Sequence, residues 1–241
     1  MGKRIKFKGI VNFRELGDFN TINDQLTQNE RIYRSSMLFA DEAADVEKMK
    51  DLEIQTIFDL RSPKEIERHP NQFKKLVPHY LTINLSGGAD AGRSLEMSKT
   101  TDDPYFMKFR YMEYLEEAKD EIAKLFRQLI QPDSLPAVVH CSAGKDRTGV
   151  ISYLLLKMAG VPIEEIVADY QVSYGYIKYD ERIIKEGHQQ NIYHSYPEIM
   201  EGLDQLFTAK YPDVADYFVS LGLNADEIEL VHGLLLGVDQ K

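Results

Sequence analysis

Residues 136–150, PAVVHCSAGKDRTGV, constrain this chain more than any other stretch. The apolar, β-branched first part predicts a short buried strand, and the apolar run from Ile151 to Met158 predicts a buried helix. A polar loop that contains Gly144 connects the two. In such a unit the N–H groups of the loop and of the first helical turn converge, and the helix dipole favours negative charge there. The stretch therefore predicts an anion-binding loop.

The loop contains Cys141, the single cysteine of the chain. A helix N-terminus favours the thiolate form of cysteine, which is the nucleophilic form. Arg147 follows six positions later, and its planar guanidinium group suits two oxygens of a bound phosphoryl group. Thr148 offers a hydroxyl to the thiolate, and the ring nitrogens of His140 are suited to orienting the loop. We therefore expect Cys141 to attack phosphorus and Arg147 to hold the phosphoryl oxygens.

The pattern His-Cys-x5-Arg-Thr-Gly over residues 140–149 resembles the signature of cysteine-dependent protein tyrosine phosphatases. The five residues between Cys141 and Arg147, Ser-Ala-Gly-Lys-Asp, resemble those of a bacterial branch of that family. Members of this branch act on phosphotyrosine and often on phosphoserine, phosphothreonine or phosphoinositides. The resemblance implies that the loop residues Ser142, Ala143, Gly144, Lys145 and Thr148 bind the phosphate or another oxyanion. A structural reading, with Cys141 as a small buried apolar residue, is less favoured because the whole signature is present.

A second stretch carries the same resemblance independently of the loop. Residues 12–17, NFRELG, are similar to the NFRDLG opening of that branch, with Glu15 in place of aspartate. Arg14 and the later Arg34 are expected either to pair with acidic partners or to face the anion site. The alternative, a solvated or structural charge, is favoured for each.

Composition narrows the possible classes of protein. The 241 residues, 43% of them hydrophobic, are expected to form one phosphatase domain, with residues 163–241 as a helical addition. The formal net charge of −10 argues against nucleic-acid partners. One cysteine allows no internal disulfide, and no run resembles a signal peptide or a membrane span. We expect a cytoplasmic protein, with export without a recognisable signal peptide left open.

Alternating helix and strand patterns predict an α/β fold. The elements expected before the loop are a helix over 41–52 capped by Asp41, a strand over 54–61, a helix that starts with a Ser62–Glu65 capping box, and a strand over 80–85. Only helical patterns follow residue 163, one of them capped by Asn224 with Glu227. The expected fold is a central, mostly parallel sheet flanked by helices, tyrosine phosphatase-like, with a helical C-terminal lid.

The departing oxygen needs a proton, and acidic residues at three places are candidates to supply it. Asp59 ends a predicted strand, at the edge where ligands bind in open α/β sheets, although a structural ion pair is the alternative. Asp146 lies in the loop and either acts as the acid or recognises, with Lys145, a polar headgroup such as an inositol. Asp102 or Asp103 would supply the proton from a mobile lid, but Asp103 is favoured as a helix cap.

Together these features predict a phosphomonoester hydrolase that uses no metal or other cofactor. Cys141 forms a cysteinyl phosphate, Asp59 or Asp146 protonates the departing oxygen, and water hydrolyses the intermediate. The expected substrate is a phosphotyrosine protein, with a phosphoinositide as the alternative. Two further readings are a phosphate-binding module without turnover and sulfur transfer on a rhodanese-like loop, which the Lys-Asp-Arg-Thr-Gly continuation disfavours.

Overall fold

The structure is a computed structural model that describes residues 3–86, 96–97, 99, 101–184 and 190–237. At its centre is a five-stranded sheet in the order β1-β2-β5-β3-β4. The strands are β1 (Arg14–Glu15), β2 (Ile32–Ser35), β3 (Thr56–Asp59), β4 (His79–Thr82) and β5 (Ala137–His140). Because β1 runs antiparallel to β2 and every other pair is parallel, the predicted mostly parallel sheet is confirmed.

The middle strand of the sheet is β5, which leads into the anion-binding loop. Its last residue, His140, is level with Ser35 of β2 and with Asp59 of β3. These three parallel strands therefore end at the same edge of the sheet. The loop after His140 begins at this edge, where open α/β sheets bind their ligands.

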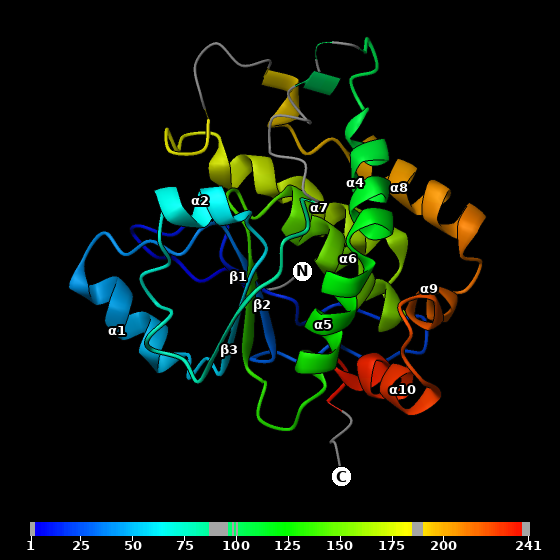
Figure 1. Cartoon of the computed structure of the whole chain (residues 1–241), viewed down its shortest axis with the longest axis horizontal. Coiled ribbons are helices and arrows are strands. Elements are labelled where there is room, and N and C mark those ends of the chain that lie inside the picture. Colours follow the sequence, from blue (N-terminus) through cyan, green and yellow to red (C-terminus); the bar gives the residue numbers. More distant parts are fainter. Residues whose placement is uncertain (1–2, 87–95, 98, 100, 185–189, 238–241) are drawn as a thin grey trace.

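Helices lie on both sides of the sheet, with α1 and α2 on one side and the remaining helices on the other (Figure 1). They are α1 (Ala43–Asp51), α2 (Pro63–Arg68), α4 (Met107–Glu117), α5 (Lys119–Leu129), α6 (Asp146–Met158), α7 (Ile163–Ile177), α8 (Pro197–Lys210), α9 (Val214–Ser220) and α10 (Ala225–Gly233). A short 3₁₀ helix, Gln190–Ile192, precedes α8. The α/β class is confirmed.

Successive residues of the central strands face two different hydrophobic cores. Phe58 and Val139 belong to the large core that the helices from α4 onward share. Ile57 and Val138 belong to a smaller core with Phe7 and with residues of α1. Successive side chains of a strand point to opposite faces, so both faces of the sheet are covered and both need apolar residues. This is why the strands appear in the sequence as short, unbroken apolar runs.

Two helices start with the predicted capping boxes. The Ser62 hydroxyl accepts the Glu65 N–H while the Glu65 carboxylate accepts the Ser62 N–H, and Asn224 and Glu227 do the same at α10. The predicted cap at Asp41 is wrong, because α1 begins at Ala43 and its N-cap is Glu42.

The predicted cap at Asp103 is also wrong, because the N-cap of α4 is Phe106. Asp103 instead accepts the Tyr105 N–H at 2.8 Å and pairs with Lys108 at 2.9 Å. Its carboxylate therefore stabilises the turn before the helix. Asp102, the other acidic residue proposed for a lid, is exposed.

Every element described after residue 163 is a helix, as predicted, with turns between them. The helix α8 packs against α4 and α7, and α9 and α10 pack against α6. In the described ranges, no helix combines the length and the apolar character needed to cross a bilayer.

Candidate active site

The loop between β5 and α6 places Cys141 at its start and Arg147 in the first helical turn. Gly144 has a φ of +67°, and a Cβ atom there would lie 2.4 Å from the backbone of Ser35. Glycine is therefore required for the loop to approach β2 so closely. The helix begins at Asp146, earlier than the predicted apolar run from Ile151, so Arg147 lies at the positive end of its dipole.

Cys141 is buried, with 2% of its surface exposed. The backbone N–H of Gly144 donates to its Sγ at a distance of 3.3 Å. The hydroxyl of Thr148 is also buried and has no hydrogen-bond partner among the described residues. One backbone N–H therefore points at the sulfur, and within the described ranges no other group competes for the Thr148 hydroxyl.

Arg147 is held by a carboxylate that the sequence pattern identified only as a helix cap. Its Nη1 and Nη2 donate to Oε2 and Oε1 of Glu65 at 2.7 and 2.8 Å. Oε1 also accepts the hydroxyl of Ser142 at 2.6 Å, and Oε2 accepts the N–H of Ser62 at 2.9 Å. The capping box of α2 thus orients the arginine of the loop. The position of Ser62–Glu65 just after β3, at the edge where the loop starts, was the available signal.

This pair is strong enough to overcome the cost of burial. Burial acts to raise the pKa of Glu65, but the hydrogen bonds and the charge of Arg147 hold it well below its usual value. For Arg147 burial acts to lower the pKa, and Glu65 raises it on balance. Both groups are therefore ionised at neutral pH, and the guanidinium plane is fixed before a substrate arrives.

Asp59 lies at the strand end that the sequence indicated, inside a buried ion pair. It accepts hydrogen bonds from Nε and Nη2 of Arg61 at 2.8 and 2.7 Å and from the hydroxyl of Tyr80 at 2.8 Å. Burial acts to raise the pKa of Asp59, but the hydrogen bonds and charge of Arg61 and the hydrogen bond from Tyr80 lower it on balance. Its ionised form is therefore the stable one.

His140 supports the base of the loop. Its Nδ1 lies 3.3 Å from the carbonyl oxygen of Cys141, and its Nε2 lies 3.0 Å from Nδ2 of Asn71. Because a carbonyl can only accept, Nδ1 carries the proton and Nε2 accepts from the amide. Burial lowers the pKa of His140, which agrees with a neutral ring.

Lys145 and Asp146 contact each other. Nζ of Lys145 donates to Oδ1 of Asp146 at 2.7 Å and to the carbonyl of His194 at 3.2 Å. The hydroxyl of Tyr111 donates to the same Oδ1 at 2.5 Å and lies 2.8 Å from that of Tyr170. The side chain of Lys145 is 1% exposed and that of Asp146 23%. Oδ2 of Asp146 has no hydrogen-bond partner in the part of the chain that the structure describes.

Comparison with known proteins identifies the family of this chain. The model of the tyrosine phosphatase family matches residues 5–237. The chain belongs to this family. A tyrosine-protein phosphatase from Nostoc commune is 30% identical over 137 residues, which cover 56% of this chain and 45% of that protein. A relative from Cupriavidus necator is 29% identical over 170 residues, which cover 69% of this chain and 61% of the relative.

The chain thus spans about half of the length of the first of these relatives and three fifths of the second. Among solved structures, the core catalytic domain of the PP-IP phosphatase SIW14 from S. cerevisiae, in complex with citrate, aligns with a TM-score of 0.42. That alignment has 15% sequence identity and covers 86% of this chain and 96% of the other.

The two arginines near the N-terminus of this family member form ion pairs. Nε of Arg14 donates to Oδ1 of Asp169 in α7 at 2.7 Å, and Nη1 of Arg34 donates to Oδ2 of the same carboxylate. All three side chains are buried. Pairing with an acidic partner, one of the roles that the sequence offered, is what the structure contains, and burial excludes the solvated charge that was favoured.

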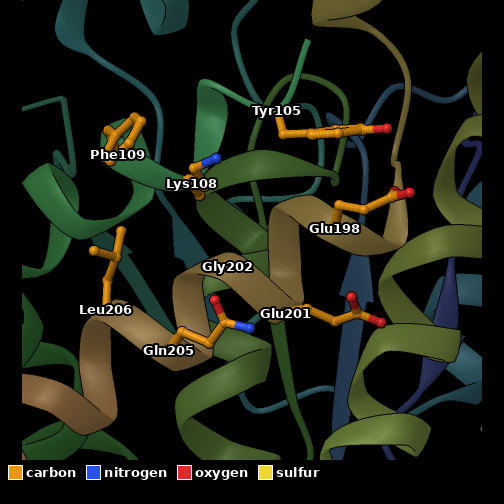
Figure 2. A pocket seen from close by; sticks show the side chains of 8 residues that line it. All are labelled: Tyr105, Lys108, Phe109, Glu198, Glu201, Gly202, Gln205 and Leu206. Carbon is orange, nitrogen blue, oxygen red and sulfur yellow. The ribbon is translucent and has the colours of Figure 1, made fainter. Parts of the chain in front are cut away.

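A groove of about 460 Å³ lies between α4 and α8, and no residue of the signature loop lines it (Figure 2). Its lining residues are Tyr105, Lys108, Phe109, Glu198, Glu201, Gly202, Gln205 and Leu206. It contains two carboxylates and one ammonium group, a charge balance that does not suit a phosphate dianion. The loop, with its converging N–H groups and Arg147, is the better anion site.

Proposed function

We propose that this chain hydrolyses phosphomonoesters through a cysteinyl phosphate on Cys141. The observation that carries the proposal is the loop itself, in which Gly144 donates to the sulfur and Glu65 fixes the guanidinium of Arg147. Donors that are fixed before the reaction stabilise the charge of the transition state without further reorganisation. Membership of the tyrosine phosphatase family supports the same reaction and makes sulfur transfer the weaker alternative.

The reaction proceeds in two displacements. The thiolate of Cys141 attacks phosphorus, the bond from phosphorus to the departing oxygen breaks, and a carboxylic acid gives that oxygen its proton. Water then attacks the phosphorus of the cysteinyl phosphate, its proton passes to the carboxylate, and inorganic phosphate and the thiolate are released. Throughout, Arg147 and the loop N–H groups bind the three equatorial oxygens.

The geometry favours Asp146 over Asp59 as the acid. A general acid must reach the departing oxygen, and Asp59 is fully buried with both of its oxygens already accepting hydrogen bonds from Arg61 and Tyr80. Asp146 is the first residue of α6 after the loop and is partly exposed, and its Oδ2 has no hydrogen-bond partner among the described residues, while Lys145 and Tyr111 hold Oδ1. We therefore assign proton transfer to Asp146.

The proposed substrate class is a protein that carries phosphotyrosine. The family and its relatives are named for this activity. Recognition of an inositol headgroup by Lys145 receives less support, because its ammonium group is buried and already donates to Asp146 and to His194. Initial rates on phosphotyrosine peptides and on phosphoinositide vesicles, compared at equal enzyme concentration, distinguish the two classes.

The reaction is tested with p-nitrophenyl phosphate in the presence of EDTA. We expect a burst of one p-nitrophenolate per active site and a phosphorylated cysteine in acid-quenched enzyme. Neither is expected in Cys141→Ser. Turnover that survives in Cys141→Ser would contradict the proposal, and phosphate binding without any burst would favour a module without turnover.

The acid is tested by comparing p-nitrophenyl phosphate with phenyl phosphate, whose leaving group is the more basic. General acid catalysis contributes about 10²–10⁴-fold, and a basic leaving group depends on it most. We expect Asp146→Asn to reduce kcat for phenyl phosphate by about a hundredfold or more, and kcat for the nitrophenyl ester much less. If Asp59→Asn shows this difference while Asp146→Asn does not, the assignment is wrong.

A further inference from the structure

Two successive peptide planes of the loop, Ala143–Gly144 and Gly144–Lys145, are held from behind by buried side chains. In a planar trans peptide the C=O and the N–H point in opposite directions. The carbonyl of Ala143 accepts from Nδ2 of Asn12 at 3.1 Å, and the N–H of Gly144, in the same peptide, donates to Sγ of Cys141 at 3.3 Å. Asn12 therefore sets the direction of a donor to the nucleophile without touching it.

The next peptide plane is held by two donors. The carbonyl of Gly144 accepts from Nδ2 of Asn12 at 2.9 Å and from Nη2 of Arg34 at 2.8 Å. The N–H of that peptide belongs to Lys145 and points the opposite way, towards the face where the loop donors converge. A charged donor on the carbonyl also polarises the amide and strengthens its N–H as a donor.

Asn12 and Arg34 are both anchored through Asp169. One oxygen of Asp169 accepts from Arg34 and the other from Arg14. Nη1 of Arg14 in turn donates to the backbone carbonyl of Asn12 at 3.2 Å and to its Oδ1 at 2.5 Å. This contact fixes the amide with Nδ2 towards the loop. Each of the four residues is 1% exposed, so water does not compete for these bonds.

We propose that Asn12, Arg34 and Asp169 are positioning residues of the phosphatase site. They set the direction of two loop peptides, and through these peptides the donors to the Cys141 sulfur and to the phosphoryl oxygens. The proposal rests on the function proposed above. The proposal also assigns a role to the NFRELG stretch, because Asn12 and Arg14 both belong to this stretch.

The substitution Asn12→Gly removes the side-chain donor to the loop together with the oxygen that accepts from Arg14. Asn12 has a φ of +59°, a conformation that glycine adopts without strain, so the backbone can stay as it is. Asp18→Gly is the matched control, because Asp18 has a φ of +60° and hydrogen-bonds Asn29 on the exposed side of the N-terminal segment. Arg34→Lys, which keeps the charge and loses the forked donor, provides a second, independent variant.

Four quantities are measured on the full chain: kcat for p-nitrophenyl phosphate, the rate of Cys141 alkylation by iodoacetamide at pH 7, the Kd for inorganic phosphate, and the Tm. We expect Asn12→Gly to lower kcat by about tenfold to a hundredfold, less than the ~10²–10³-fold cost of removing an oxyanion donor outright. Alkylation should slow and phosphate affinity weaken several-fold in the same variant. Asp18→Gly should match the wild type in kcat, alkylation rate and phosphate affinity. Arg34→Lys should lose phosphate affinity, because the Lys145 N–H is no longer aligned, yet stay more active than Arg34→Met.

The proposal would be overturned if folded Asn12→Gly had the alkylation rate and the phosphate affinity of the wild type. It would also be overturned if Asp18→Gly lost as much in these two quantities as Asn12→Gly. If Asn12→Gly does not fold, Arg34→Lys decides, and its wild-type phosphate affinity and kcat would overturn the proposal. Alkylation and phosphate binding do not depend on turnover. A wild-type protein that hydrolyses no ester would therefore refute the proposed function while both readouts still test the positioning role.

Discussion

Glutamine in place of Glu65 tests whether one carboxylate both caps α2 and orients Arg147. The two oxygens of Glu65 receive four donors: Oε1 accepts from Arg147 and Ser142, and Oε2 accepts from Arg147 and Ser62. The amide of glutamine has one oxygen, so its NH₂ group faces two of these donors. The Ser142 hydroxyl can turn and accept, but a guanidinium nitrogen cannot. At least one bond to Arg147 is therefore lost together with the negative charge.

The size of the effect follows from the burial of this pair. A hydrogen bond to a charged group contributes about 1.5–3 kcal/mol, and the Glu65 side chain is only 15% exposed, so solvent screens the pair little. We expect the free energy of unfolding to fall by about 1.5–3 kcal/mol at pH 7. In a protein of this size each kcal/mol shifts the Tm by about 2–4 °C, so the Tm should fall by about 3–12 °C.

The pH dependence gives a second check with a definite sign. A carboxyl group whose pKa is lowered in the folded state stabilises the fold fully above its unfolded value, about 4.3 for glutamate, and loses this contribution as the pH falls. The difference between wild type and Glu65→Gln should therefore be full at pH 7 and shrink below about pH 4. Urea unfolding at a series of pH values measures both proteins.

Glu227→Gln is a matched control, because Glu227 completes the capping box of α10 and pairs with Arg127 at 3.1 Å. This pair is more exposed and touches no residue of the loop, so we expect no measurable change in stability or activity. Glu65→Gln should also lower kcat/KM for p-nitrophenyl phosphate, since Arg147 is no longer held in plane. This reasoning would be refuted if Glu65→Gln had the same free energy of unfolding as the wild type at pH 7. It would also be refuted if the difference between the two proteins stayed the same below pH 4.

Three further predictions concern the loop and its surroundings. Asp59→Asn should lower the free energy of unfolding by about 3–5 kcal/mol in urea titrations, because it leaves Arg61 buried without its counter-ion. Gly144→Ala should weaken inorganic phosphate binding in calorimetric titrations at least tenfold, about 1.4 kcal/mol, since its φ is +67° and the new Cβ would meet Ser35. Turnover of p-nitrophenyl phosphate should be the same with and without EDTA, and a loss on chelation that Mg²⁺ or Zn²⁺ restores would count against the mechanism.

Features that depend on neighbouring residues were predictable from the sequence. The strand, loop and helix around Cys141 follow from an apolar run, a glycine and a second apolar run. The Ser62 capping box is equally local, because its two partners are three residues apart. The predicted cap at Asp41 is wrong because the local rule overlooks Asp45, one turn later. The Asp45 carboxylate accepts the backbone N–H groups of Asp41, Lys8 and Gly9. Lys8 and Gly9 are distant in the sequence, so no local rule includes them.

The supports of the loop were not predictable, because their partners lie far apart in the chain. Glu65 reaches Arg147 across 82 positions and Arg14 reaches Asp169 across 155. A signal for Asp169 was present, since it stands among Ile166, Val167 and Tyr170 on the buried side of α7, where an unpaired carboxylate would be costly. This pattern predicts a cationic side chain near Asp169, but it does not identify the residue that supplies it.

The separation between Arg14 and Asp169 has a consequence for the newly made protein. A ribosome adds about 5–20 residues per second, so the 155 positions between them take roughly 8–31 s to synthesise. Contacts between such distant segments also form late, because closing a long loop costs entropy before the contact stabilises it. Cys141 is therefore made before the α7 carboxylate that anchors its loop. If Asp169 has the proposed positioning role, a chain released before α7 is made should hydrolyse p-nitrophenyl phosphate more slowly than the full chain, because Arg14 and Arg34 lack their shared carboxylate.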